Sequence, residues 1–262
     1  MKVVDLHVHS NWSSDSNIPI PKALKYCSAN DITGIAFTDH LDIGFPSSRS
    51  PLLNIPSLLF ELSHLQAAVK IRILKGIEVG ITKSNITETQ NILDIFFFDF
   101  IIASCHGNDT VSFCTKEARN IYPNTLLDVY LEQILWIVTH LKTFHTLAHF
   151  DYIMRYHPIS VDDFVRRTSQ IDLILHQLKK RDKALEINTK GITLPNNKRF
   201  LRFLLKRWKQ VGGKWVTFGS DAHQINNIGN HYQIAKKILL EAGFSAFAIP
   251  WRNRWRYLND ES

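Results

Sequence analysis

Short hydrophobic runs alternate with longer amphipathic runs along almost the whole chain. Seven short runs rich in β-branched and aromatic residues are typical of buried strands. They cover residues 3–8, 34–38, 71–77, 100–105, 144–148, 184–188 and 215–219. Between them, apolar residues recur at three- and four-residue spacing, which predicts helices. The clearest of these cover residues 21–29, 57–69, 125–141, 161–180, 198–210 and 231–242.

The regular alternation of strands and helices predicts a mainly parallel sheet with helical crossovers. An open doubly wound sheet and a closed barrel both fit this pattern. No glycine-rich phosphate loop follows the first predicted strand, which argues against the nucleotide-binding open sheet. The length of 262 residues is normal for an α/β barrel. We therefore expect a single domain spanning residues 1–262.

Residue types that bind metals recur where the predicted strands end. Asp5, His7 and His9 alternate along the first strand, and the period of two predicts that they share one face. The later strand ends carry Asp39 and His40, Glu78, His106, His149 and Asp151, Glu186 and Asn188, and Asp221 and His223.

A lone histidine at a strand end is more often an ordinary polar residue than a metal ligand. In a barrel, however, the carboxyl ends of the strands meet at one face, where active sites lie. So many uncompensated imidazoles and carboxylates would be costly to bury together, and divalent cations remove that cost. The pattern therefore favours the barrel over the open sheet and predicts a multinuclear metal site, in which Glu78 can bridge two ions.

Composition and charge narrow the classes of function. The chain starts without an apolar leader segment, and its most hydrophobic stretch, residues 92–102, is interrupted by Asp94 and Asp99. We therefore expect a cytoplasmic protein with no membrane contact. Three cysteines without CxxC spacing predict neither a disulfide framework nor a zinc finger. No pattern specifies the oligomeric state.

The net charge of +7 favours anionic partners. Basic runs occur at residues 179–181, 206–209 and 251–256. Solvated helix faces are the usual explanation of such runs. Arginine and tryptophan interleave in the last run, so nucleic acid stays open as a weaker alternative partner.

The strand-end motifs, in order, resemble those of the polymerase-and-histidinol-phosphatase (PHP) superfamily. They lie at residues 5–10, 38–40, 76–78, 103–106, 148–151 and 219–223 and read DLHVHS, TDH, GIE, ASCH, AHFD and GSDAH. Within the superfamily the chain is most similar to the histidinol-phosphatase family. This narrower resemblance lies at residues 130–133, 149–156, 185–189 and 242–244, which read YLEQ, HFDYIMRY, LEINT and AGF.

The resemblance implies a distorted (β/α)7 TIM-like barrel with a site for two or three divalent ions, which we expect to be zinc, manganese or iron. It implies three ligand sets: His7, His9, Glu78 and Asp221; Glu78, His106 and His149; and His40 and His223 with a residue just after the first strand. Many relatives have a histidine at that last position, and Asp15 is the expected ligand here because a carboxylate can serve the same hard cation. The alternative for Asp15 is a turn residue.

The implied activity is hydrolysis of a small phosphorylated substrate, L-histidinol phosphate, by a hydroxide that bridges two metals. Arg155 is expected to grip the phosphate, with a salt bridge as its alternative role. Asp5 is expected to orient a ligand histidine through its other ring nitrogen. Glu186 and Asn188 are expected to fill the barrel or orient its ligands. A PHP-type nuclease or nucleotide phosphatase, and a non-catalytic metal-binding barrel, are the competing functions.

Overall fold

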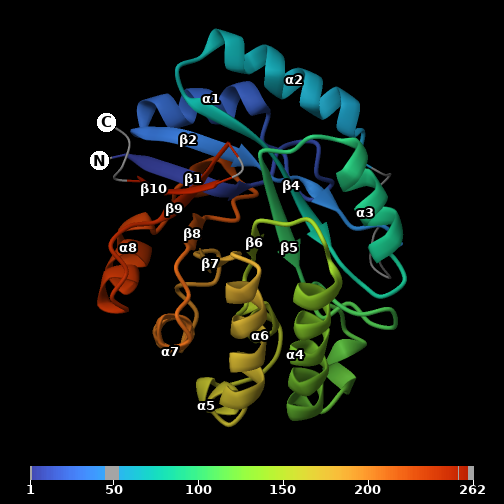
Figure 1. The fold of residues 1–262 in the computed structure, drawn as a ribbon. Helices are drawn as coiled ribbons and strands as arrows, with labels where there is room; N and C mark the ends of the chain where they lie inside the picture. The colour runs from blue at the N-terminus through green and yellow to red at the C-terminus, as the bar shows by residue number, and fades with distance from the viewer. Residues whose placement is uncertain (1, 45–52, 253, 259–262) are drawn as a thin grey trace.

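The computed structural model describes residues 2–44, 53–252 and 254–258. Seven parallel strands form a nearly closed barrel with helices around its outside (Figure 1). In hydrogen-bonded order they are β1 (Val3–Val8), β2 (Ile32–Phe37), β4 (Arg72–Gly80), β5 (Phe100–Ser104), β6 (Thr146–Leu147), β7 (Ala184–Asn188) and β8 (Val216–Gly219). A two-residue strand, β3 (His40–Leu41), also pairs with β4. The predicted distorted seven-stranded barrel is therefore confirmed.

The barrel closes between its first and last strands at their carboxyl ends. The amide of Asp221 donates to the carbonyl of His7 over 2.7 Å, and the amide of His9 donates to the carbonyl of Ala222 over 3.0 Å. Val8 and Ala222 form a parallel bridge at the same place. Residues more than 200 positions apart in the sequence thus come together at this seam, which lies beside the predicted metal ligands.

The helices pack their apolar faces against the outer face of the barrel. They are α1 (Ile20–Ala29), α2 (Ile55–Ala68), α3 (Ile86–Ile95), α4 (Pro123–His140), α5 (Val161–Val165), α6 (Thr168–Lys180), α7 (Asn197–Gln210) and α8 (Tyr232–Glu241). The hydrophobic pattern did not predict α3, because its buried positions include the polar Thr89 and Gln90. Among the helices of the described ranges, none is long and apolar enough to cross a membrane.

The prediction of one continuous helix over residues 161–180 is wrong. The segment forms two helices, α5 and α6, separated at Arg166 and Arg167. The guanidinium of Arg167 bonds Asp128 and the carbonyls of Asn124 and Asp163, which fixes the corner between the two helices. Both halves keep a buried apolar face, so the three- and four-residue spacing alone could not reveal the break.

An extra residue in β1 changes which side chains face the barrel interior. Asp5 pairs with Ile35 and Val8 with Phe37, so three steps along β1 match two steps along β2. This register shift is a bulge, which reverses the alternation of side chains. Val4 and Leu6 join the apolar cluster inside the barrel, and beyond the bulge His7 points inward instead.

The predicted role of Asp5 is therefore wrong. Asp5 lies on the opposite side of β1 from His7, and its carboxylate accepts the backbone amides of His7, Ser220 and Gly229 at 3.3, 2.9 and 2.7 Å. Within the described part of the chain it has no hydrogen bond to a histidine ring. Burial raises the pKa of Asp5 to about 6, although these hydrogen bonds act in the opposite direction. Asp5 thus holds the barrel seam through backbone amides, including that of His7.

A C-terminal hairpin plugs the amino-terminal end of the barrel. Strands β9 (Ala248–Trp251) and β10 (Arg254–Tyr257) pair antiparallel, and the Trp255 indole donates to the carbonyl of Asp182 over 3.0 Å. Ile249 and Leu258 are buried against interior side chains of the barrel strands, which are Val4, Leu6, Ala36, Leu74, Phe100 and Ile102. For residues 251–256, of which residue 253 lies outside the described ranges, the expected helix is wrong because the segment is part of this hairpin. The expected solvation holds for its basic side chains, since Arg252, Arg254 and Arg256 are exposed.

We predict that Ile249→Ala lowers the free energy of unfolding by about 2–5 kcal/mol, since Ile249 is 1% exposed and its loss leaves a cavity. Leu240→Ala is the matched control, because Leu240 is 49% exposed and its truncation should change stability by no more than about 0.5 kcal/mol. Urea unfolding followed by circular dichroism measures both. Equal effects of the two substitutions would show that the hairpin does not belong to the core.

Candidate metal centre

Glu78 stands at the centre of a buried cluster at the carboxyl ends of the strands. Strand β4 carries this glutamate into the barrel, where it is 1% exposed. Five imidazoles place a nitrogen between 2.8 and 3.4 Å from its two carboxylate oxygens: His7, His9, His40, His106 and His149. Burial alone would raise the pKa of Glu78, but His7, His40 and His106 hold it well below its usual value. The cluster therefore keeps Glu78 ionised.

Glu186 of β7 orients two members of this cluster. Its Oε1 lies 2.7 Å from Nδ1 of His7, and its Oε2 accepts the backbone amide of His149 over 2.8 Å. Asn188 donates its side-chain amide to the same carboxylate over 3.0 Å. A β-carbon on Gly219 would lie 2.2 Å from Oε1 of Glu186, so β8 must carry a glycine there. Glu186 thus has the orienting role that the sequence left open between two alternatives.

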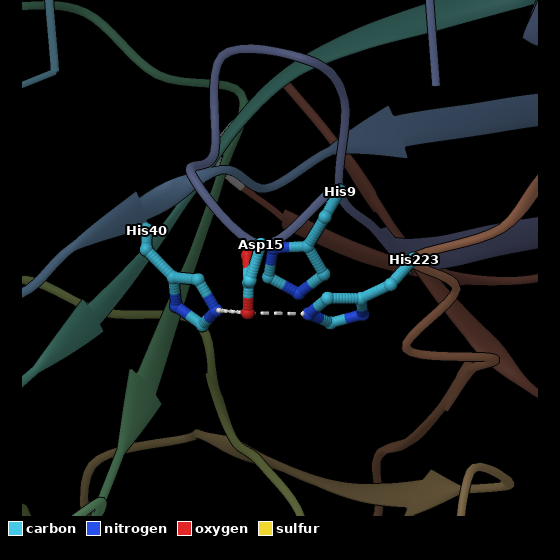
Figure 2. Close-up of side chains that lie close together, drawn as sticks. All are labelled: His9, Asp15, His40 and His223. Carbon is cyan, nitrogen blue, oxygen red and sulfur yellow. Dashed lines mark hydrogen bonds and ion pairs between the residues drawn. The ribbon is translucent and has the colours of Figure 1, made fainter. Parts of the chain in front are cut away.

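A second group of side chains lies at the rim of the barrel. Figure 2 shows Asp15 between His40 and His223, with His9 behind it. One oxygen of Asp15 is 3.0 Å from Nε2 of His223 and 3.5 Å from Nε2 of His40. Burial alone would raise the pKa of Asp15, but hydrogen bonds with His223 and His40 outweigh it and lower the pKa. The structure therefore brings Asp15 to the other residues predicted for the third metal, and it adds His9 to them.

The loop that carries Asp15 is held by the buried carboxylate of Asp39. Asp39 accepts four hydrogen bonds, from the backbone and side chains of Ser10 and Ser13. The Ser13 hydroxyl in turn accepts the backbone amide of His40 over 3.0 Å. Asp39 therefore does not face the cluster itself but fixes the positions of both Asp15 and His40.

The donor atoms of the cluster fit divalent cations. Within the described ranges, Nε2 of His7, Nε2 of His9 and Oε2 of Glu78 are buried without a hydrogen-bond partner, although they converge. Leaving such atoms unpaired costs about 1–3 kcal/mol each. Neutral imidazole nitrogens and carboxylate oxygens are the usual ligands of zinc, manganese and iron. Several overlapping groups of three or four such residues have the spacing to hold an ion.

Asp221, which follows β8, joins the cluster to two basic side chains. Its carboxylate accepts from Nη1 of Arg155 over 3.0 Å and lies 3.1 Å from Nζ of Lys190. Its backbone has φ of +54°, a left-handed conformation that the hydrogen bond to His7 at the seam maintains. His149 also has a positive φ, of +23°. Uncommon backbone conformations of this kind gather at functional sites.

Arg155 lies beneath the cluster, with a side chain 7% exposed. Besides Asp221, its guanidinium donates to Asp151 over 3.2 Å and to Asn188 over 2.9 Å. A guanidinium has five N–H donors, so these three bonds leave two for other acceptors. The salt bridge considered as its alternative role is present, and the grip on phosphate stays a prediction.

Three residues near the cluster were missed by sequence reasoning. Lys190 places its ammonium 3.1 Å from Nδ1 of His223, Asp42 faces His106, and Tyr152 packs on the rings of His106 and His149. Asp42 had a signal, because it lies two positions after His40. Lys190 had a weaker one, since it follows the carboxyl end of a predicted strand. Tyr152 had only its place within the motif at residues 149–156.

A barrel with such a cluster at its carboxyl end is typical of metal-dependent hydrolases. The family model of the PHP domain matches residues 5–190. The chain belongs to the PHP family.

Within this family, the chain is similar in sequence to histidinol-phosphatases. The chain is 32% identical to a histidinol-phosphatase of Lactococcus lactis, over 95% of this chain and 94% of the relative. It is 26% identical to a probable histidinol-phosphatase of Clostridium acetobutylicum, over 90% and 92% of the two chains.

Solved structures agree with this. The fold matches that of histidinol phosphate phosphatase from Lactococcus lactis, solved in complex with zinc, L-histidinol and phosphate. The TM-score is 0.87 at 30% identity, with 98% of this chain and 100% of the other covered. Metal-dependent tyrosine phosphatases of Bacillus subtilis and Streptococcus pneumoniae share the fold at 14% identity and a TM-score of 0.53.

We predict that Glu78→Gln removes at least one equivalent of bound metal and lowers turnover by about a hundredfold or more. The physical reason is that the glutamine amide keeps the shape of the side chain but loses the negative charge that five imidazoles surround. Replacing even a residue that only contacts a metal ligand typically lowers metal affinity or activity by about 10–100-fold. Elemental analysis of protein purified without chelator measures the metal. Glu88→Gln, on an exposed position of α3, is the control. Parental metal content in Glu78→Gln would contradict a central role for Glu78.

We predict that Asp15→Ala lowers turnover while two equivalents of metal remain bound, because Asp15 contacts only the rim group. Isothermal titration of the metal-free protein with zinc counts the sites. If both the stoichiometry and the kinetics stay parental, Asp15 has only its turn role.

Proposed function

We propose that this protein is an L-histidinol phosphate phosphatase, which hydrolyses L-histidinol phosphate to L-histidinol and phosphate in histidine biosynthesis. The observation that carries the proposal is the match along nearly the whole chain, in sequence and in fold, to a histidinol phosphate phosphatase solved with L-histidinol and phosphate. The convergence of histidines and carboxylates at the barrel end supports the same conclusion.

We propose three metal sites from the side chains that converge. His7, His9, Glu78 and Asp221 hold the first, and Glu78, His106 and His149 the second. Asp15, His40 and His223 hold the third, next to His9. The donor set suits zinc, manganese or iron.

When bound, the metals supply charge neutralisation at the phosphoryl oxygens and an activated water as nucleophile. The protein contributes the positions of the groups around them. Lys190, with a side chain 41% exposed beside His223, is placed to meet the outer oxygens of a phosphate from the solvent side. Arg155 fixes Asp221 and has two N–H donors left for the phosphate. The positive charges of Lys190 and Arg155 favour binding of the dianionic substrate and stabilise the negative charge that develops during phosphoryl transfer.

We also propose that residues 1–262 form one catalytic domain. The segment after β8 pairs with β1, and the C-terminal hairpin fills the barrel end, so both ends of the described chain contribute to one core.

The nuclease alternative is weakened by the placement of the aromatic side chains in the basic C-terminal run. Trp255 packs beside Trp215 and His145 at the barrel end, where its indole is engaged with Asp182. The guanidinium of Arg256 lies 4.5 Å from the centroid of the Trp251 ring. These rings therefore offer little free surface for stacking with nucleic-acid bases.

The test is a panel of phosphate-release assays on the zinc- and manganese-loaded protein. We predict a kcat/KM for L-histidinol phosphate at least tenfold above that for nucleoside monophosphates and p-nitrophenyl phosphate, and no cleavage of short single-stranded DNA. Higher efficiency on nucleotides or DNA would replace the proposed function by the nuclease or nucleotide-phosphatase alternative. Bound metal without turnover of any substrate would favour the non-catalytic barrel.

A further inference from the structure

Asp42 lies at the edge of the cluster, in a position that the proposed metal sites leave without a role. It follows the short strand β3, and its side chain is 22% exposed. Its Oδ1 accepts the backbone amide of Gly80 over 2.9 Å, and its Oδ2 lies 3.3 Å from Nδ1 of His106. The carboxylate is therefore held by β4 on one side and faces an imidazole on the other.

The geometry of His106 shows why a carboxylate matters at this place. Nε2 of His106 lies 3.3 Å from Oε1 of Glu78, while Nδ1 faces Asp42. A neutral imidazole offers a lone pair from one nitrogen only, and a carboxylate at Nδ1 keeps the proton there. Nε2 is then free to act as a ligand on the side of Glu78.

Gly80 makes this contact sterically feasible. A β-carbon at this position would lie 2.2 Å from Oδ1 of Asp42 and 3.1 Å from Nδ1 of His106. Strand β4 thus supplies Glu78 on one side of the His106 ring and, two residues later, the glycine that lets Asp42 reach the other side. Glu186 has the equivalent relation to His7, whose Nδ1 it contacts over 2.7 Å.

We propose that Asp42 is a positioning residue for His106, which it holds in the ring orientation and tautomer that present Nε2 to a metal shared with Glu78 and His149. Gly80 contributes to this arrangement because the absence of a β-carbon leaves room for the Asp42 carboxylate. The proposal rests on the metal sites of the proposed function and is independent of the substrate assigned to them.

The decisive variant is Asp42→Asn. If the asparagine oxygen accepts the Gly80 amide as before, its NH2 group faces Nδ1 of His106 and moves the ring proton to Nε2. We expect the weakest-bound equivalent of zinc to bind about 10–100-fold less tightly, as measured by competition with a chromophoric chelator in the absence of substrate. At a fixed low zinc concentration, kcat should fall with the lost metal, whereas KM should change less than threefold.

Asp99→Asn is the matched control. Asp99 also accepts a backbone amide of β4, that of Lys75 over 2.9 Å, but it stands just before the amino-terminal end of β5, away from the carboxyl ends of the strands. It should keep parental metal affinity. Gly80→Ala should weaken the same equivalent as Asp42→Asn, and combining the two changes should add little, because both disturb one contact.

Thermal unfolding of the metal-free proteins separates positioning from general stability. Parental melting together with weakened zinc binding in Asp42→Asn supports the proposal. Parental zinc affinity, or a loss of affinity matched by an equal loss of metal-free stability, would overturn it. If zinc binding weakens as expected but the parent protein does not hydrolyse L-histidinol phosphate, the proposed substrate fails and the role of Asp42 stands.

Discussion

The need to compensate the buried carboxylate of Glu78 constrains most of this structure. A glutamate that is 1% exposed and ionised is stable only with positive charge or hydrogen-bond donors close by. The Ser104 hydroxyl donates to it over 2.6 Å, and five imidazoles surround the rest of the carboxylate. These imidazoles lie on, or directly after, four strands, β1, β3, β5 and β6. The barrel must therefore bring these strand ends within a few ångströms of one point. The stability of the fold thus depends on the same contacts that form the site.

A layer of carboxylates around the imidazoles sets their orientation. Glu186 contacts Nδ1 of His7, and Asp42 faces Nδ1 of His106. Asp39 works indirectly, through the two serines that carry the Asp15 loop. Each outer carboxylate is anchored by amide donors, which limits its motion. Precise placement of ligands at a metal site depends on such an outer layer as much as on the ligands themselves.

The two ends of the barrel have different roles, one in the apolar core and the other in the site. The amino-terminal end is apolar. It is closed by Ile249 of the C-terminal hairpin and by Leu258, which directly follows the hairpin. The carboxyl end holds the polar cluster, and the bulge in β1 marks the change between them. The same strand can thus contribute Leu6 to the core and His7 to the site, because the bulge turns the adjacent side chains to the same interior.

The sequence by itself determined the barrel class, the succession of the seven barrel strands along the chain and nearly all side chains that meet in the cluster. Hydrophobic periodicity reports local structure, and strand-end residues of a parallel barrel necessarily meet at one face. The role of Asp5, the break between α5 and α6, and the hairpin plug were decided only by the tertiary structure. A one-residue bulge reverses the alternation on which the prediction for Asp5 depended, and it arises from pairing with β2. The strand-end pattern placed Glu186 at the site but could not show that it contacts His7, 179 residues away. It likewise did not show that Asp42 contacts His106, 64 residues away, because no local pattern encodes such a pairing.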